Sequence, residues 1–242
     1  MPLRCRKYSG ESDCSKMIRG FTLVELAIVM AIIGILIGGV LLAQEMLQQA
    51  QTTSLISQIS SYRSAVTTFN DAYSGLPGDL RNASSRLPDC TAACNPATAG
   101  AGNGIIGRPD WGSAGWPAQL PAAGMSLPPT TVGEETQLFW LHLVRANLIS
   151  GVSDSAMVTQ TVPAWGVTHP SSPLGGGVVA GHGDGSGYWG VGPSGLVLLL
   201  WMAPNTSLGS LCNGACPLTA SIAARIDRKV DDGQASKGSV QA

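Results

Sequence analysis

Hydrophobic and polar positions divide the N-terminal part of the chain into a wholly apolar segment and an amphipathic one. Residues 26–43 read LAIVMAIIGILIGGVLLA, eighteen apolar residues with no charge and no proline. As a helix rising about 1.5 Å per residue, this run covers roughly 27 Å, close to the roughly 30 Å hydrocarbon core of a bilayer. A buried helix of a soluble protein is the alternative, but such helices usually keep a polar face. The run therefore predicts one membrane span.

After Ala43 the apolar residues recur at spacings of three and four, which is typical of one face of a helix. The stripe consists of Leu55, Ile59, Tyr62, Val66, Phe69 and Tyr73. No proline occurs between Phe21 and Leu76, so a single helix is expected to run to about Tyr73, with its second half packed on a folded domain. Two helices with a hinge near residues 48–53 are the alternative.

The rest of the pattern predicts a small α+β domain. Leu76-Pro77-Gly78-Asp79 is a turn signature that ends the long helix, and residues 77–133, rich in glycine, proline and small polar residues, predict a long irregular loop. Residues 134–149, EETQLFWLHLVRANLI, predict a second helix that stops at Gly151. Its apolar face would consist of Leu138, Leu141, Val144 and Leu148.

Three short runs further on, at 177–180, 187–191 and 196–202, predict strands of an antiparallel sheet. The last reads LVLLLWM, too short to cross a bilayer, and predicts a central strand buried on both faces. Residues 217–230 predict a short helix with Pro217 in its first turn.

Charge is scarce and unevenly placed. Only 12% of the residues are charged and the net charge is −1, which gives no general electrostatic reason to bind nucleic acid. Residues 1–20 nevertheless carry five basic against two acidic residues, and the next basic residue is Arg63. The positive-inside rule therefore predicts a cytoplasmic N-terminus, with everything beyond the span on the far side of the membrane.

The junction between the basic leader and the apolar run, Gly20-Phe21-Thr22-Leu23-Val24-Glu25, resembles the processing site of type IV prepilins and pseudopilins. In that family a basic leader ends in Gly, Phe commonly follows, and a Glu comes four residues later. The resemblance implies that a prepilin peptidase cuts between Gly20 and Phe21 and methylates the new Phe21 amine. The apolar helix is then retained, unlike a cleaved secretory signal. Translation starting at Met17 instead of Met1 would give a shorter leader.

Glu25 is a lone carboxylate at the start of the apolar segment. Such a charge costs on the order of several kcal/mol unless a partner neutralises it, and the sequence of its own helix offers no cation. The resemblance suggests the cationic amine of Phe21 on a neighbouring subunit, so that the pair forms in a filament. The alternative is a first-turn Glu favoured by the helix dipole and wetted at the membrane edge.

Four cysteines remain after the proposed processing, as the pairs Cys90 with Cys94 and Cys212 with Cys216. On the oxidising side of the membrane, disulfides are the expected state. Two local bridges are the first interpretation and a crosslink between the pairs is the second. Zinc held by four thiolates is a third, because the spacing falls within the range of zinc ligands.

The sequence predicts no cofactor and no catalytic centre. The segments 183–185 and 231–233 each combine a carboxylate with turn residues, and some pseudopilins bind calcium near their C-terminal region, but turn formation accounts for both segments. His142, His169 and His182 are expected to be packing or surface residues, because no nucleophile elbow, H-E-x-x-H or phosphate-binding loop is present.

Taken together, the resemblance implies a type IV pilin-like α+β fold, with a long N-terminal helix packed on a small antiparallel sheet and long irregular loops. The expected divisions are a removed leader at 1–20, a membrane and filament-core helix at 21–44, its amphipathic continuation at 45–75 and a globular domain at 76–242. We expect a structural subunit of a type IV pilus or pseudopilus, with a minor tip subunit that binds a surface, DNA or a secreted substrate as the alternative.

The implied partners are membrane lipid, prepilin peptidase, inner-membrane assembly machinery and other subunits in a helical homo- or heteropolymer. The expected location is the bacterial inner membrane, as a single-pass protein, and then a periplasmic or extracellular filament.

Overall fold

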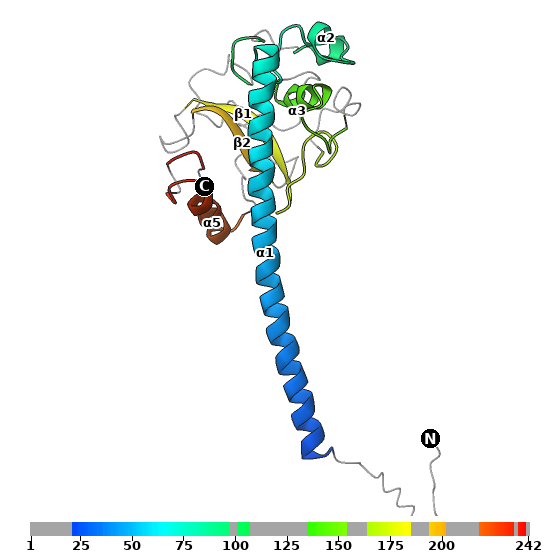
Figure 1. Ribbon diagram of the computed structural model, residues 1–242, viewed down its shortest axis with the longest axis vertical. Helices are drawn as coiled ribbons and strands as arrows, with labels where there is room; N and C mark the ends of the chain where they lie inside the picture. Colours follow the sequence, from blue (N-terminus) through cyan, green and yellow to red (C-terminus); the bar gives the residue numbers. More distant parts are fainter. Residues whose placement is uncertain are drawn as a thin grey trace, which may run out of the picture. The chain divides into compact units, whose positions relative to one another are not determined.

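The computed structural model describes residues 21–96, 101–106, 135–153, 164–184, 194–201, 218–234 and 237–240. Figure 1 shows the elements in chain order. They are the helices α1 (Leu23–Tyr73), α2 (Ala83–Arg86) and α3 (Glu135–Arg145), the 3-10 helix η1 (Ala92–Cys94), the strands β1 (Gly177–Asp184) and β2 (Ser194–Trp201), and the helix α5 (Ala220–Val230). The chain forms two compact units, Met1–Gln48 and Gln49–Ala242.

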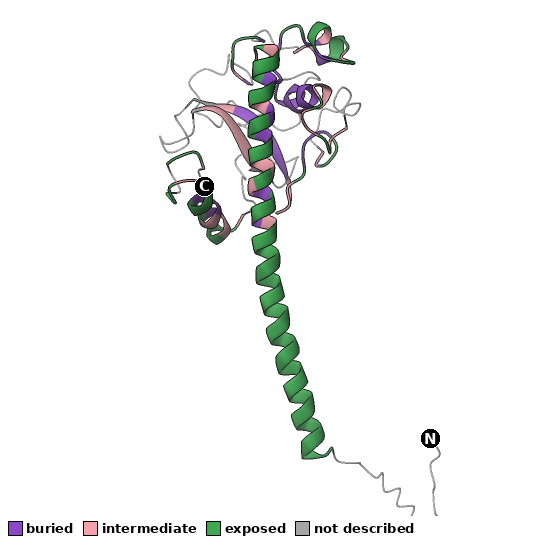
Figure 2. Ribbon diagram, viewed as in Figure 1, coloured by how far each residue is buried: buried purple, intermediate pink, exposed green. Residues whose placement is uncertain are grey.

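In the first unit, every described residue from 21 to 48 is exposed (Figure 2). Of the helices in the described ranges, α1 is long and apolar enough to cross a membrane. It is a single helix of 51 residues, which confirms the long N-terminal helix and excludes the two-helix alternative. A helix that is apolar on all sides, as this part of α1 is, belongs in lipid or packed among other helices.

In the second unit, the predicted stripe of α1 lies on the core. Leu55, Tyr62 and Phe69 are buried, and the intervening Ile59, Val66 and Tyr73 are partly buried against the core cluster. The spacing of three and four therefore identified the buried face correctly, because residues at that spacing share one side of a helix.

Helix α3 is the centre of this core. All nine residues from Glu135 to Leu143 are buried, whereas the sequence pattern predicted one apolar face. The helix is shorter than expected and ends in a Schellman-type cap, with Asn147 at a φ of 56° and the Leu148 N–H donating to the Leu143 carbonyl. Asn147, rather than the expected Gly151, is the residue that stops it.

The connection between α1 and α3 is more ordered than the predicted irregular loop. Within its described part it carries α2 and η1. It also contributes several apolar residues to the core cluster, namely Leu80, Ala83, Leu87, Cys94 and Ile106. This segment therefore covers α3; residues 107–134 lie outside the described ranges.

The sheet has two described strands, paired antiparallel from Gly177 opposite Trp201 to Asp184 opposite Ser194. Val178, Val179 and Ala180 of β1 are buried, while residues 195–200 of β2 are only half-buried. The prediction that this run is buried on both faces is therefore wrong for residues 195–200. The prediction that it forms a central strand stays a prediction. The third predicted strand, 187–191, lies outside the described residues.

Helix α5 confirms the predicted C-terminal helix but begins later. Its N-cap is Thr219, whose side chain accepts a hydrogen bond from the Ile222 N–H. The first turn therefore starts at Ala220, and Pro217, which lies outside the described residues, is not part of it.

Candidate assembly site and its supporting core

The first turn of α1 is closed by a capping box. Glu25 N–H donates to Thr22 Oγ1 at 3.2 Å, and Glu25 Oε2 accepts from the Thr22 N–H at 3.3 Å and from Thr22 Oγ1 at 3.2 Å. This reciprocal arrangement of a Thr and a Glu three residues later satisfies donors that the helix itself leaves open. The sequence Thr22-Leu23-Val24-Glu25 therefore encodes a helix start as well as the processing motif.

The capping box gives Glu25 hydrogen-bond donors from its own helix turn but no cation, so the prediction that the helix itself does not neutralise this carboxylate stays a prediction. Both of the donors that this carboxylate accepts from are neutral groups of Thr22, and both bind the same oxygen, Oε2. Both Glu25 and Phe21 are exposed, with Phe21 83% accessible. The site thus presents one exposed carboxylate, with its Oε1 free of the local donors, at the start of an apolar helix. Gly20, the other residue of the predicted cleavage site, lies outside the described residues.

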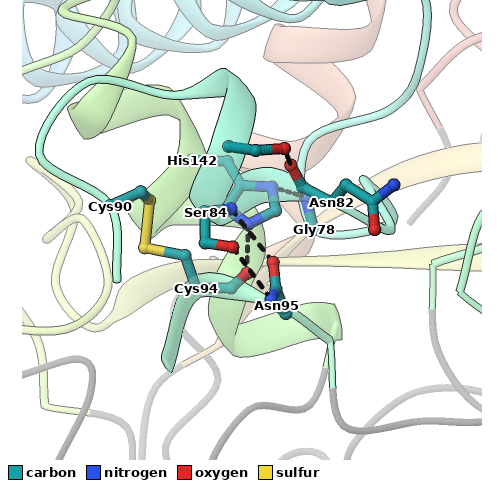
Figure 3. The surroundings of a disulfide bond; sticks show 8 residues. Gly78, Asn82, Ser84, Cys90, Cys94, Asn95 and His142 are labelled. Carbon is teal, nitrogen blue, oxygen red and sulfur yellow. Dashed lines mark hydrogen bonds between the residues drawn. A yellow bond between two sulfur atoms is a disulfide. The ribbon is translucent and has the colours of Figure 1, made fainter. Parts of the chain in front are cut away.

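The buried core of the second unit is organised around His142 of α3 (Figure 3). Its Nδ1 accepts a hydrogen bond from the Gly78 N–H at 2.8 Å, and its Nε2 lies 2.8 Å from the Cys94 carbonyl oxygen. A carbonyl oxygen only accepts, so Nε2 carries the proton and the ring is neutral. Burial lowers the pKa of His142 to about 4, against the smaller opposing effect of the Cys94 carbonyl.

A disulfide joins Cys90 to Cys94 beside this histidine (Figure 3). The bridge closes the turn that presents the Cys94 carbonyl, and the Asn95 side chain ties the same turn to α2 by bonding both the N–H and the hydroxyl of Ser84 at 3.0 Å. The first interpretation of the cysteines is confirmed for this pair, and a four-thiolate zinc site is excluded because these sulfurs are bonded to each other. Cys212 and Cys216 lie outside the described residues.

The turn after α1 touches α3 so closely that only glycine fits. Gly78 has a φ of +85°, and a Cβ on it would lie 2.3 Å from the Glu135 carbonyl oxygen. The neighbouring Asp79 is buried, and its carboxylate accepts the N–H groups of Gly102, Asn103 at 3.3 Å and Gly104 at 2.7 Å. The predicted turn is thus present: Gly78 packs against the start of α3, and Asp79 ties the turn to residues 102–104 of the connection.

The other two histidines differ in environment. His169 is buried, with Nδ1 at 3.0 Å from Thr168 Oγ1, and burial lowers its pKa to about 3. His182 is half-buried on β1, where partial burial lowers its pKa. With His142 engaged by backbone atoms on both ring nitrogens, the two buried histidines have the packing roles predicted for them.

At the end of α5, the structure brings together three carboxylates. One oxygen each of Asp227, Asp231 and Asp232 lies within 4.8 Å of the others. The sequence pattern indicates Asp231 and Asp232, which lie in a turn segment, but not Asp227. The available signal was its position four residues before Asp231, which places both on the same side of a helix. Of the other acidic segment, 183–185, residue 185 and the side chain of Asp184 are not described.

The long apolar helix, the small antiparallel sheet and the other helices define a type IV pilin-like α+β fold. The sequence adds the particular signature: residues 15–41 match the family model described as the prokaryotic N-terminal methylation motif, the mark of type IV prepilins and pseudopilins. No curated protein and no solved structure matches the chain. The match covers the leader junction and the apolar helix; the globular unit lies beyond it.

Proposed function

We propose that this chain is a structural subunit of a type IV pilus or a secretion pseudopilus, stored in the inner membrane with its N-terminus in the cytoplasm and then polymerised. The observation that carries this proposal is the apolar first half of α1, exposed on all sides and headed by a single charged carboxylate. In the membrane, lipid covers this surface; in a filament, the same helices of other subunits do.

The methylation motif supports processing by a prepilin peptidase, which would cut between Gly20 and Phe21 and methylate the Phe21 amine. The cut would leave the capping box intact, since Thr22 and Glu25 both lie after it. Intact mass and N-terminal sequence of the chain from the membrane fraction test this step. A mature chain that starts before Phe21 or after Ala43 would contradict it.

Glu25 is proposed to pair with the Phe21 amine of a neighbouring subunit. Both local donors bind Oε2, so Oε1 is available to a neighbour's ammonium group while the first turn stays capped. A carboxylate moved into the apolar centre of a filament without such a cation would be buried and unpaired, which is strongly unfavourable. Pairing therefore links the packing of the helices to the correct axial position of each subunit.

Glu25→Ala tests this pairing, with Glu45→Ala as the matched control, because Glu45 is a second exposed carboxylate on the same helix. We expect Glu25→Ala to be processed normally but to lose about tenfold or more of its recovery in sheared filaments, since removing one member of a buried ion pair costs about 3–5 kcal/mol. Glu45→Ala should assemble as the wild type does. Normal filaments from Glu25→Ala would refute the pairing.

The chain as a minor tip subunit is the alternative to the chain as a major subunit. The number of copies per filament distinguishes these two roles. A major subunit dominates sheared filaments by mass, whereas a tip subunit is present at a few copies per filament. Quantitative mass spectrometry of the sheared fraction against the other methylation-motif proteins of the cell measures this ratio directly.

A further inference from the structure

We propose that Cys90 is a thiol-exchange site: a small external thiol opens the Cys90–Cys94 bridge at the Cys90 sulfur, and Cys94 stays in place to close the bridge again. His142 is the positioning residue that holds Cys94. This inference goes beyond the proposed function, because it concerns the chemistry of the globular unit and holds whether or not the chain assembles into filaments.

The two bridged cysteines differ in exposure. Cys94 is 1% exposed and belongs to the core cluster, whereas Cys90 is half-buried and packs against that cluster from outside. The neighbours of Cys90 in the chain, Asp89 and Thr91, are exposed. The rate of thiol–disulfide exchange depends on which sulfur is attacked and on how accessible that sulfur is. An external thiol therefore reaches the bridge at Cys90.

The exchange involves no net oxidation. The external thiol gives up its proton, and its sulfur bonds to Cys90 Sγ while the bond between Cys90 Sγ and Cys94 Sγ breaks. Cys94 leaves as a thiolate and takes up a proton. The product carries a mixed disulfide on Cys90 and a free thiol on Cys94. Reclosure is the reverse step, in which the Cys94 sulfur attacks Cys90 Sγ and releases the external thiol.

The backbone around Cys94 is held by contacts other than the bridge (Figure 3). The Cys94 N–H donates to the Thr91 carbonyl at 2.9 Å, and the Cys94 carbonyl accepts from His142 Nε2 at 2.8 Å. The side chain of the next residue, Asn95, ties the same turn to α2. Opening the bridge breaks none of these bonds, so the mixed disulfide is expected in a folded molecule with the Cys94 sulfur still close to Cys90.

His142 is suited to this positioning role because its ring has a fixed orientation. Nδ1 accepts the Gly78 N–H at 2.8 Å, so the proton lies on Nε2 and is directed at the Cys94 carbonyl. The side chain is fully buried, and its ring stacks on Phe69 of α1 at a centroid distance of 6.1 Å and an interplanar angle of 14°. The core therefore holds the turn that carries Cys94 from its inner side.

The first test is the reaction of the full chain, in detergent under native conditions, with cysteamine. This small thiol carries a positive charge, which the exposed carboxylate of Asp89 favours. Acid quenching, alkylation of the free thiols and peptide mass spectrometry identify the sulfur that carries cysteamine. We expect at least about tenfold more adduct on Cys90 than on Cys94, with the tryptophan fluorescence of the folded chain retained.

Two single variants compare the cysteines without the bridge. Cys94→Ser leaves Cys90 as a free thiol, and Cys90→Ser leaves Cys94. With cystamine, the disulfide of cysteamine, Cys90 in the first variant should form the mixed disulfide at least about tenfold faster than Cys94 in the second. Both variants lack the same bridge, so the loss of the bridge does not account for a difference in rate.

Reclosure tests the role of His142. After rapid removal of the excess thiol, the release of cysteamine from Cys90 measures the rate at which Cys94 attacks. His142→Phe keeps a flat ring but loses both hydrogen bonds, and it should slow reclosure by about fivefold, the typical effect of one hydrogen bond. His142→Gln, which can still donate to the Cys94 carbonyl, should restore most of the wild-type rate. Val178→Ala, which removes buried volume from β1 in the same core, is the matched control and should reclose as the wild type does.

Three results would overturn the proposal. They are equal amounts of adduct on Cys90 and Cys94, a bridge that cysteamine opens only in denaturant, and a reclosure rate that His142→Phe leaves unchanged or that Val178→Ala slows equally. None of them bears on filament assembly, so failure here is distinguishable from failure of the proposed function.

Discussion

The neutral state of His142 should make the globular unit sensitive to mild acid. In the folded protein, Nδ1 accepts the Gly78 N–H, and a protonated ring has no lone pair with which to do so. Burial lowers the folded-state pKa to about 4, whereas the unfolded chain has an ordinary histidine pKa of about 6.5. Between these two values, the unfolded chain binds more protons than the folded one.

The sign and the size of the effect follow from linkage. Because the unfolded state takes up the proton first, the free energy of unfolding is highest above pH 6.5 and falls as the pH is lowered through 6.5 toward 4. With a folded-state pKa of about 4, His142 alone should cost about 2 kcal/mol between pH 7 and pH 5, and about 3 kcal/mol once fully protonated. The total loss of unfolding free energy is therefore greatest near pH 4, the folded-state pKa.

The assay is urea unfolding of the full chain in detergent, followed by tryptophan fluorescence, at pH 7, 6 and 5. His142→Gln removes the titrating group, so it should be less stable than the wild type at pH 7, and the difference should shrink by about 2 kcal/mol at pH 5. His169 shifts in the same direction in both proteins and cancels in the comparison. A difference that stays constant from pH 7 to pH 5 would refute the assigned hydrogen bonds.

Two further substitutions test the contacts around this histidine. Gly78→Ala should destabilise the fold by at least about 1–3 kcal/mol, the cost of backbone strain alone at a positive φ. The collision of the new Cβ with the Glu135 carbonyl adds to this cost. An unfolding midpoint equal to that of the wild type would show that the turn is placed differently. Replacing Cys90 and Cys94 together by Ser should cost about 2 kcal/mol, the value for so short a loop, and reductant should lower the midpoint of the wild type but leave that of the double variant unchanged.

Elements that depend on local periodicity were predictable from the sequence. The stripe of α1 follows a 3.6-residue period, and its members, Tyr62 and Phe69 among them, are buried or partly buried. The positions of α3 and α5 were also predicted, but not their ends, because Asn147 rather than Gly151 stops α3 and Thr219 rather than Pro217 begins α5. The Thr-x-x-Glu pattern at Thr22 and Glu25 is also the sequence signature of a capping box, and the processing motif shares these residues.

Features that depend on distant neighbours were not predictable. The hydrogen bonds of His142 go to backbone atoms of residues 64 and 48 positions away, and backbone partners leave no trace in side-chain identity. The apolar run of β2 looked like a central strand, yet in the described sheet it pairs with β1 and is half-buried. The burial of Asp227 likewise depends on what surrounds α5, and sequence spacing alone gave no sign of it.

The way α3 is enclosed has a consequence for protein engineering. A fragment trimmed for crystallisation would ordinarily lose its glycine- and proline-rich connections first, because they look dispensable. Here the connection supplies Leu80, Leu87 and Ile106 to the same core as Trp140, all of them at most 4% exposed. Trimming it would bring α3 into contact with water along its length, and an aggregating product would result instead of a smaller stable one.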